Sequence, residues 1–254
     1  MKGGKGLTAC CVCIVLAASW ILPVWGCAKS HAGGRVAIGA VDTAGRPVAV
    51  PDTGVLRWLA LGDSYTIGQS VAEADRYPVQ AAGLLKRGGV AMGAPEIIAT
   101  TGWTTQNLQD AIRGKTAMPP YALVTLLIGV NNQYQGRSVD EYKTQFAALL
   151  DQSIQLAGGR PGRVIVLSIP DYSVTPFAAG YDRAAIARSI DVFNEAARQL
   201  SAQYKVRWLD VTAASRMAAD DKTLLAADSL HFSGKEYGVW AAMLAPLVGQ
   251  ALSQ

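Results

Sequence analysis

Five short segments of the chain are almost continuously apolar, and longer segments with a different periodicity separate them. Strands with one solvent-exposed face alternate apolar and polar residues, whereas strands covered on both faces do not. The five runs therefore predict parallel strands buried inside one sheet. They span Leu56–Leu61, Glu96–Thr100, Leu123–Ile128, Val164–Ile169 and Val206–Leu209.

The segments between these runs have the spacing of amphipathic helices. Apolar residues recur every three or four positions in three of them, which is the period of one helix face. These stripes cover Tyr142–Ile154, Ile186–Tyr204 and Tyr237–Ala251. Ser138 with Glu141, and Ser233 with Glu236, match the capping box that begins a helix.

Shorter helices are expected near Pro78–Arg87 and Thr105–Arg113. Strand and helix thus alternate about five times, which predicts an α/β protein: a three-layer α/β/α sandwich around a five-stranded parallel sheet. Ligands of such open sheets bind at the carboxyl ends of the strands. Candidate functional residues are therefore sought there.

The first 27 residues have the features of an export signal. Lys2 and Lys5 precede the run Leu7–Trp25, in which no residue is charged, and a basic start before an apolar core is typical of a secretory signal. The run ends in Val24-Trp25-Gly26-Cys27, which resembles a bacterial lipobox and predicts lipidation of Cys27. An uncleaved anchor and ordinary secretion stay open as alternatives, because the run is just long enough to span a bilayer.

The segment after this signal is rich in glycine and proline, as is typical of a tether. We therefore divide the chain into the export segment 1–27, the tether 28–54 and one folded domain, 55–254. All four cysteines fall within the export segment, so the domain has no disulfide scaffold or zinc-finger pattern. The expected location is the periplasm or the cell surface, with the lipidated terminus in the membrane.

Charge and histidine content exclude two classes of function. Without Lys2 and Lys5 the chain has 21 basic and 19 acidic residues, with no basic cluster that would favour nucleic-acid binding. Two histidines are too few for a multi-histidine metal site. Phosphate-binding glycine motifs are also absent from the sequence. We therefore expect no nucleic-acid partner, metal or cofactor.

Polar residues suited to acyl chemistry follow three of the predicted strands and precede the last helix. The first strand ends in Gly62-Asp63-Ser64, where the serine is a candidate nucleophile. Gly102 follows the second strand, Asn131 follows the third, and Asp228-x-x-His231 precedes the last capping box. Each motif alone is also common in turns. Because the other histidine, His31, lies in the tether, His231 is the one imidazole base in the predicted domain.

In their order and spacing these motifs resemble the sequence blocks of the GDSL, or SGNH, hydrolases, a family of serine esterases and lipases. Gly62-Asp63-Ser64 is similar to the first block and Gly102 to the glycine of the second. Gly129-Val130-Asn131 is similar to the third block and Asp228-x-x-His231 to the last. The resemblance extends from about Leu56 to the end of the chain and implies a flavodoxin-like fold.

The resemblance also implies two-step ester hydrolysis through an acyl-enzyme. Ser64 would be the nucleophile, His231 its general base and Asp228 the carboxylate that orients the imidazole. The oxyanion hole would consist of the backbone N–H groups of Ser64 and Gly102 and the side-chain amide of Asn131. This chemistry requires neither a metal nor a cofactor.

Two positions depart from the family pattern. Tyr65 stands where leucine is usual, and Asn132 stands where aspartate is usual. Neither is expected to touch a catalytic atom, although both could alter the pocket. Asp63 belongs to the first block and is expected to fix the turn rather than to take part in catalysis.

The sequence leaves the substrate open among small-molecule, lipid and glycan esters. A carbohydrate O-deacetylase or an acyl thioesterase would use the same catalytic residues, and a non-catalytic cell-envelope binding module is the alternative from another class. The loop Ile169–Phe177 is expected to influence specificity. Aromatic residues near the strand ends are candidates for lining a pocket: Tyr65, Trp103, Tyr134, Tyr172, Phe177 and Phe232.

Overall fold

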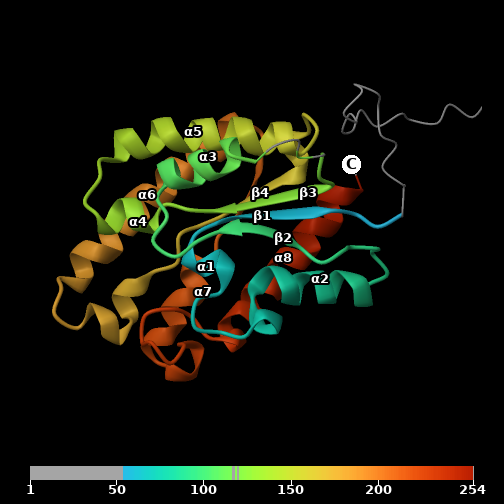
Figure 1. Ribbon diagram of the computed structural model, residues 1–254. Coiled ribbons are helices and arrows are strands. Elements are labelled where there is room, and N and C mark those ends of the chain that lie inside the picture. Colours follow the sequence, from blue (N-terminus) through green and yellow to red (C-terminus); the bar gives the residue numbers. More distant parts are fainter. Residues whose placement is uncertain (1–53, 116–117, 119, 254) are drawn as a thin grey trace, which may run out of the picture. The chain divides into compact units, whose positions relative to one another are not determined.

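A computed structural model describes residues 54–115, 118 and 120–253 of the chain (Figure 1). The predicted export segment, its lipidation site Cys27 and the tether up to residue 53 lie outside the described residues. Within the described ranges, no helix is both long enough and apolar enough to cross a membrane.

Five parallel strands form one sheet in the order β2-β1-β3-β4-β5. Their bounds are Trp58–Gly62 for β1, Glu96–Ala99 for β2, Leu123–Leu127 for β3, Val164–Leu167 for β4 and Arg207–Leu209 for β5. All residues of β1, β3 and β4 are buried, as their continuous apolar character predicts. The predicted five-stranded parallel sheet is confirmed. The first strand begins two residues later than expected, because Leu56 forms an isolated bridge with Met92 instead.

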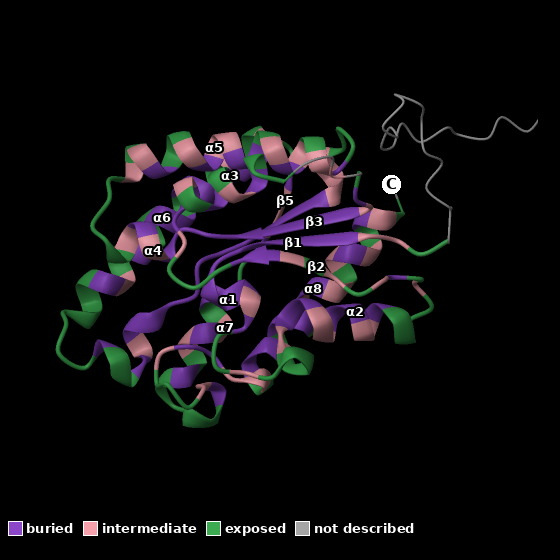
Figure 2. Cartoon of the chain, viewed as in Figure 1, coloured by how far each residue is buried: buried purple, intermediate pink, exposed green. Residues whose placement is uncertain are grey.

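Helices cover both faces of the sheet, so the predicted three-layer sandwich is also confirmed (Figure 1). The helices on one face are α3 (Thr105–Arg113), α5 (Val139–Leu156) and α6 (Arg183–Gln203). The other face is covered mainly by α2 (Tyr77–Arg87) and α8 (Gly234–Leu252), which pack on each other. Figure 2 shows the consequence of this layering: the central strands β1, β3 and β4 are buried, and the helices are exposed along their outer faces.

The two predicted capping boxes form only in part. Ser138 Oγ accepts a hydrogen bond from Glu141 N at 3.1 Å, and Ser233 Oγ accepts one from Glu236 N at 3.4 Å. Neither glutamate returns a bond to its serine, because both carboxylates bind other side chains. The serine halves of the boxes therefore set the first residues of α5 and α8.

Asn132 explains how the chain accommodates one of its departures from the family pattern. It lies fully buried on α4 (Val130–Tyr134), where its Oδ1 accepts from Thr105 N at 3.0 Å. Its Nδ2 donates to Thr105 Oγ1 at 2.7 Å, and that hydroxyl in turn donates to Gln145. An amide can accept and donate in this chain of bonds, whereas an ionised carboxylate only accepts. Asn132 thereby fixes α4, which carries Asn131, against the start of α3.

Candidate active site

Ser64 lies where β1 ends and the one-turn helix α1 (Ser64–Ile67) begins. Asp63 caps this helix, because its Oδ1 accepts from Tyr65 N at 3.1 Å. Gly62 has no room for a side chain: a Cβ there would overlap Thr66 and the backbone of β3. Gly62 thus allows the end of β1 to pack closely against Thr66 and β3. The Asp63 cap starts α1 at Ser64, which lines the pocket.

The carboxyl group of Asp63 is fully buried, and it does not line the pocket that contains Ser64. Burial raises its pKa to about 7, against the opposing effect of its backbone hydrogen bonds. Its Oδ2 has no hydrogen-bond partner among the described residues. This placement agrees with the expected structural role of Asp63 at the turn.

Asp228 and His231 are joined by side-chain and backbone hydrogen bonds on the loop before α8. His231 Nδ1 lies 2.6 Å from Asp228 Oδ2, and Asp228 Oδ1 accepts from the backbone N–H groups of Leu230 at 3.0 Å and His231 at 2.9 Å. Ser229 between them has a φ of +62°, which closes the loop on itself. With Nδ1–H donating to the carboxylate, the other ring nitrogen, Nε2, is left for a reacting group.

The hydrogen bonds around Asp228 keep its carboxylate charged. Burial alone would raise the pKa of this group, but bonds from the Ser70 hydroxyl, the His231 ring and two backbone N–H groups hold it well below its usual range. A charged carboxylate orients the imidazole and stabilises the imidazolium that forms when the ring takes a proton. Ser70 was not expected from any sequence motif; its hydroxyl donates to Asp228 Oδ2 at 2.6 Å.

The two other predicted oxyanion donors follow β2 and β3: Gly102 lies on the loop after β2, and Asn131 lies on α4. Gly102 has a φ of +84°, and no atom lies within 4 Å of where its Cβ would be, so its backbone faces open space. Asn131 Nδ2 donates one hydrogen to the Trp103 carbonyl oxygen at 2.9 Å. The amide has a second hydrogen in a fixed direction, which can be donated to a ligand.

Ser64, Gly102, Asn131 and His231 line one pocket of about 160 Å³. The structure thus brings together the predicted nucleophile, base and oxyanion donors, with Asp228 behind the imidazole. No hydrogen bond joins Ser64 Oγ to the His231 ring in the described part of the chain. In enzymes, bonds of this kind often tighten only when substrate binds.

Four of the six aromatic residues proposed as pocket lining do line it: Tyr65, Tyr134, Tyr172 and Phe177. The other two do not. Phe232 is fully buried and packs on Trp240 with ring centroids 5.5 Å apart, and Trp103 packs against the core. Both were chosen because they lie near a strand end, but their side chains pack in or against the hydrophobic core.

An aromatic wall stands at one side of the pocket; we use this name for Tyr134, Tyr172, Phe177 and Tyr181. Successive rings of the wall lie 6.0–6.3 Å apart between centroids. Tyr134 is 51% exposed, Phe177 38% and Tyr181 55%. A contiguous set of exposed rings beside a pocket is unusual on a soluble surface and marks a place where a ligand can bind.

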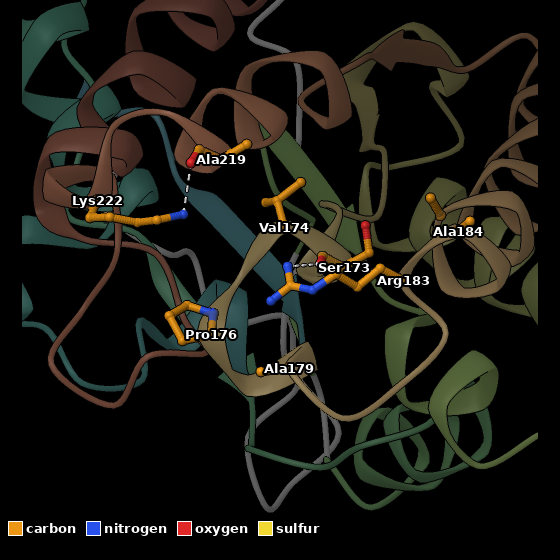
Figure 3. A pocket seen from close by; sticks show the side chains of 9 residues that line it. Ser173, Val174, Pro176, Ala179, Arg183, Ala184, Ala219 and Lys222 are labelled. Carbon is orange, nitrogen blue, oxygen red and sulfur yellow. Dashed lines mark hydrogen bonds between the residues drawn. The ribbon is translucent and has the colours of Figure 1, made fainter.

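The loop after β4 lines both this pocket and a second cavity of about 600 Å³, and Figure 3 shows the second cavity. Tyr172 and Phe177 face the pocket of Ser64, whereas Ser173, Val174, Pro176 and Ala179 line the second cavity. In Figure 3, Arg183 and Lys222 at the second cavity bind the carbonyl oxygens of Ser173 and Ala219. Tyr172, Phe177 and Tyr181 of the aromatic wall therefore lie on one loop, whereas Tyr134 lies on α4.

Hydrogen bonds at both ends hold the segment 171–177 in place. Asp171, at its start, is buried and accepts from Arg216 Nε at 2.9 Å and from Ser173 N at 2.8 Å. Phe177 N donates to the carbonyl oxygen of Ser229 at 3.1 Å, in the middle of the Asp228–His231 loop. A backbone hydrogen bond thus joins the wall to the loop that carries His231.

Metal-binding residues do not gather at this site or elsewhere in the described ranges. No group of three or more histidine, cysteine, aspartate or glutamate side chains is arranged there to hold a metal ion.

A sequence model of the GDSL-like Lipase/Acylhydrolase family matches residues 60–239. No curated protein sequence matches the chain.

Several solved structures share the fold at low sequence identity. A crystal structure of TesA superposes with a TM-score of 0.61 at 17% identity and covers 77% of this chain and 99% of its own. The acetylxylan esterase Axe2 from Geobacillus stearothermophilus superposes with a TM-score of 0.59 at 18% sequence identity; the match covers 76% of this chain and 94% of Axe2. The psychrotrophic esterase EstA from Pseudoalteromonas sp. superposes with a TM-score of 0.57 at 15% sequence identity; the match covers 78% of this chain and 99% of EstA.

Proposed function

The chain belongs to the GDSL-like Lipase/Acylhydrolase family, and we propose that it is a carboxylic ester hydrolase that forms an acyl-enzyme on Ser64. The observation that carries this proposal is the shared pocket of Ser64, His231, Gly102 and Asn131, with Asp228 hydrogen-bonded to the far side of the imidazole. Nucleophile, base and oxyanion donors are the parts that acyl transfer requires.

The first half of the reaction acylates the serine. Ser64 Oγ attacks the ester carbonyl carbon while its proton passes to His231 Nε2, and the carbonyl oxygen becomes an oxyanion. The backbone N–H groups of Ser64 and Gly102 and the Asn131 amide donate to that oxygen. When the tetrahedral intermediate collapses, the carbon–oxygen bond to the alcohol breaks and His231 returns the proton to the leaving oxygen.

The second half releases the acid. Water attacks the acyl carbon, His231 accepts one of its protons, and a second oxyanion forms in the same hole. Collapse of this intermediate breaks the bond to Ser64 Oγ, which regains its proton from His231. Asp228 stays ionised throughout, in keeping with the lowered pKa of its carboxyl group.

The Asn131 amide tests the assignment of the oxyanion hole. Asn131→Ala is expected to lower kcat for p-nitrophenyl acetate by about 10²–10³-fold, the usual effect of losing one oxyanion donor. Ser64→Ala should abolish turnover. Gln135→Ala is the control, because Gln135 is an exposed neighbour that binds only Arg137 by its side chain. An unchanged kcat for Asn131→Ala would remove Asn131 from the hole, and substantial activity of Ser64→Ala would overturn the proposal.

The pocket and the wall beside it indicate the class of ester. At about 160 Å³ the pocket equals about five water molecules at ~30 Å³ each, which suits a short acyl group. Its lining residues include no lysine, arginine, aspartate or glutamate, so nothing there recognises a phosphorylated alcohol or thiol. The aromatic wall offers ring faces and tyrosine hydroxyls to the rest of the substrate.

We therefore favour a short-chain ester of an uncharged, ring-bearing alcohol, such as an acetylated sugar. Carbohydrate O-deacetylation is therefore the second candidate function, and the pocket favours it over thioester hydrolysis. Among the proteins of similar fold, Axe2 is described as an acetylxylan esterase.

Removing one ring of the wall tests this substrate class. Phe177→Ala should raise KM for an acetylated xylooligosaccharide about tenfold, the equivalent of about 1.4 kcal/mol of lost ring contact. KM for ethyl acetate, which has no ring, should change much less. The measurement is steady-state acetate release, with Val192→Ala as a control at an exposed apolar residue outside the wall. An equal rise for both esters, or none for the sugar, would contradict the substrate class.

We further propose that the protein is exported and held in the membrane by a lipid on Cys27. The support is the basic and apolar pattern of residues 1–27 and the lipobox-like end of that run. Expressed in a bacterial host fed an alkyne fatty acid, the wild-type chain should take up the label and sediment with membranes. Cys27→Ser should lose both properties. An unlabelled wild-type chain would favour an uncleaved anchor or plain secretion.

A further inference from the structure

Ser70 contacts the candidate catalytic carboxylate from an unexpected part of the chain. Its hydroxyl donates to Asp228 Oδ2 at 2.6 Å, and the same oxygen accepts from His231 Nδ1 at 2.6 Å. Asp228 Oδ1 is already occupied by two backbone N–H groups of its own loop. Among the described residues, Ser70 therefore supplies the one hydrogen bond to this carboxylate that comes from outside the loop 228–231.

The backbone at Ser70 adopts a conformation that is uncommon for a residue with a side chain. Ser70 has a φ of +67°, directly after a turn in which Gly68 has a φ of +69°. Residues with a side chain seldom adopt this left-handed region, and such positions cluster at functional sites. Here the conformation aims an otherwise exposed hydroxyl at Asp228.

The neighbouring residue fixes the same short loop to the other side of the site. Gln69 N donates to the Ser64 carbonyl oxygen at 2.9 Å, and Gln69 Oε1 accepts from Thr101 Oγ1 at 2.7 Å. Thr101 precedes Gly102, the candidate oxyanion donor. Gln69 thus reaches the oxyanion side of Ser64, and Ser70 reaches the base side.

We propose that Ser70 is a positioning residue for the Asp228–His231 pair, acting by sharing Asp228 Oδ2 with the imidazole. This inference rests on the proposed ester hydrolysis. The shared bond fixes the carboxylate in the plane that the Nδ1–H needs and withdraws part of its negative charge from the ring. Loss of the hydroxyl leaves Asp228 a stronger acceptor, which holds a proton on His231 more firmly.

Few titratable groups face the His231 ring. Asp228 contacts it from its own loop, and Tyr65 of α1 meets it edge to face with ring centroids 5.6 Å apart. Burial keeps the pKa of the Tyr65 hydroxyl well above its usual value, so this group stays neutral in the range where histidine titrates. A change in the titration of the ring can therefore be ascribed to Asp228 and its partners.

The test measures the titration of the His231 imidazole by NMR and the pH dependence of kcat/KM. In a His31→Gln background His231 is the only histidine of the chain, so its ring C–H resonances report one titration. Ser70→Ala and Ser70→Gly should both move the titration midpoint to higher pH, because both remove the hydroxyl. The acid limb of kcat/KM for p-nitrophenyl acetate should move the same way, with a several-fold loss of kcat. Glycine relieves the backbone strain that alanine retains, so an effect common to both belongs to the hydroxyl.

Gln69→Ala is the matched control, because it disturbs the same loop without touching Asp228. Its titration midpoint should stay at the wild-type value. A midpoint that does not move in either Ser70 variant, or that moves equally in Gln69→Ala, would overturn the role of Ser70. A wild-type chain that hydrolyses no ester would overturn the proposed function, and the resonance titration would still decide whether Ser70 acts on His231.

Discussion

The parallel pairing of β1 with β2 on one side and β3 on the other decides where most candidate catalytic groups lie. Gly62, the last residue of β1, is aligned with Ala99 of β2 and Leu127 of β3. Because the three strands end at the same level, the residues that follow them meet at one rim. Ser64, Gly102 and Asn131 reach the same pocket for this reason, although they are far apart in the sequence.

The base reaches this rim by different means. His231 lies on the loop before α8, where Ala226 N donates to the His231 carbonyl oxygen and Leu225 pairs with Phe232. Tyr65 packs its ring between His231 and Trp240, at centroid distances of 5.6 and 6.4 Å. Tyr65, which replaces the usual leucine after Ser64, is thus a buried contact between α1, the loop 228–231 and α8. This departure from the family pattern therefore packs against the loop that carries His231.

The sequence was sufficient for those features that depend on local pattern. Continuous apolar runs marked all five strands, and short motifs at their ends marked the residues that the pocket brings together. Ser70 could not be found this way, because its partner Asp228 lies 158 positions away and the contact needs a left-handed backbone. Trp103 and Phe232 were only candidates for lining the pocket, and they lie against or within the core, since a position near a strand end does not determine which way a side chain points. The export segment and Cys27 remain predictions.

The most direct test of a serine nucleophile activated by His231 is covalent labelling of the intact protein. A fluorophosphonate reacts with a serine hydroxyl that a neighbouring base deprotonates, and intact mass followed by peptide mapping identifies the modified residue. The account predicts one adduct per chain, on Ser64, with labelling slowed severely in folded His231→Ala. Folded wild-type protein that takes up no label, or takes it up at another residue, would contradict the account and favour a binding module that retains the fold without the chemistry.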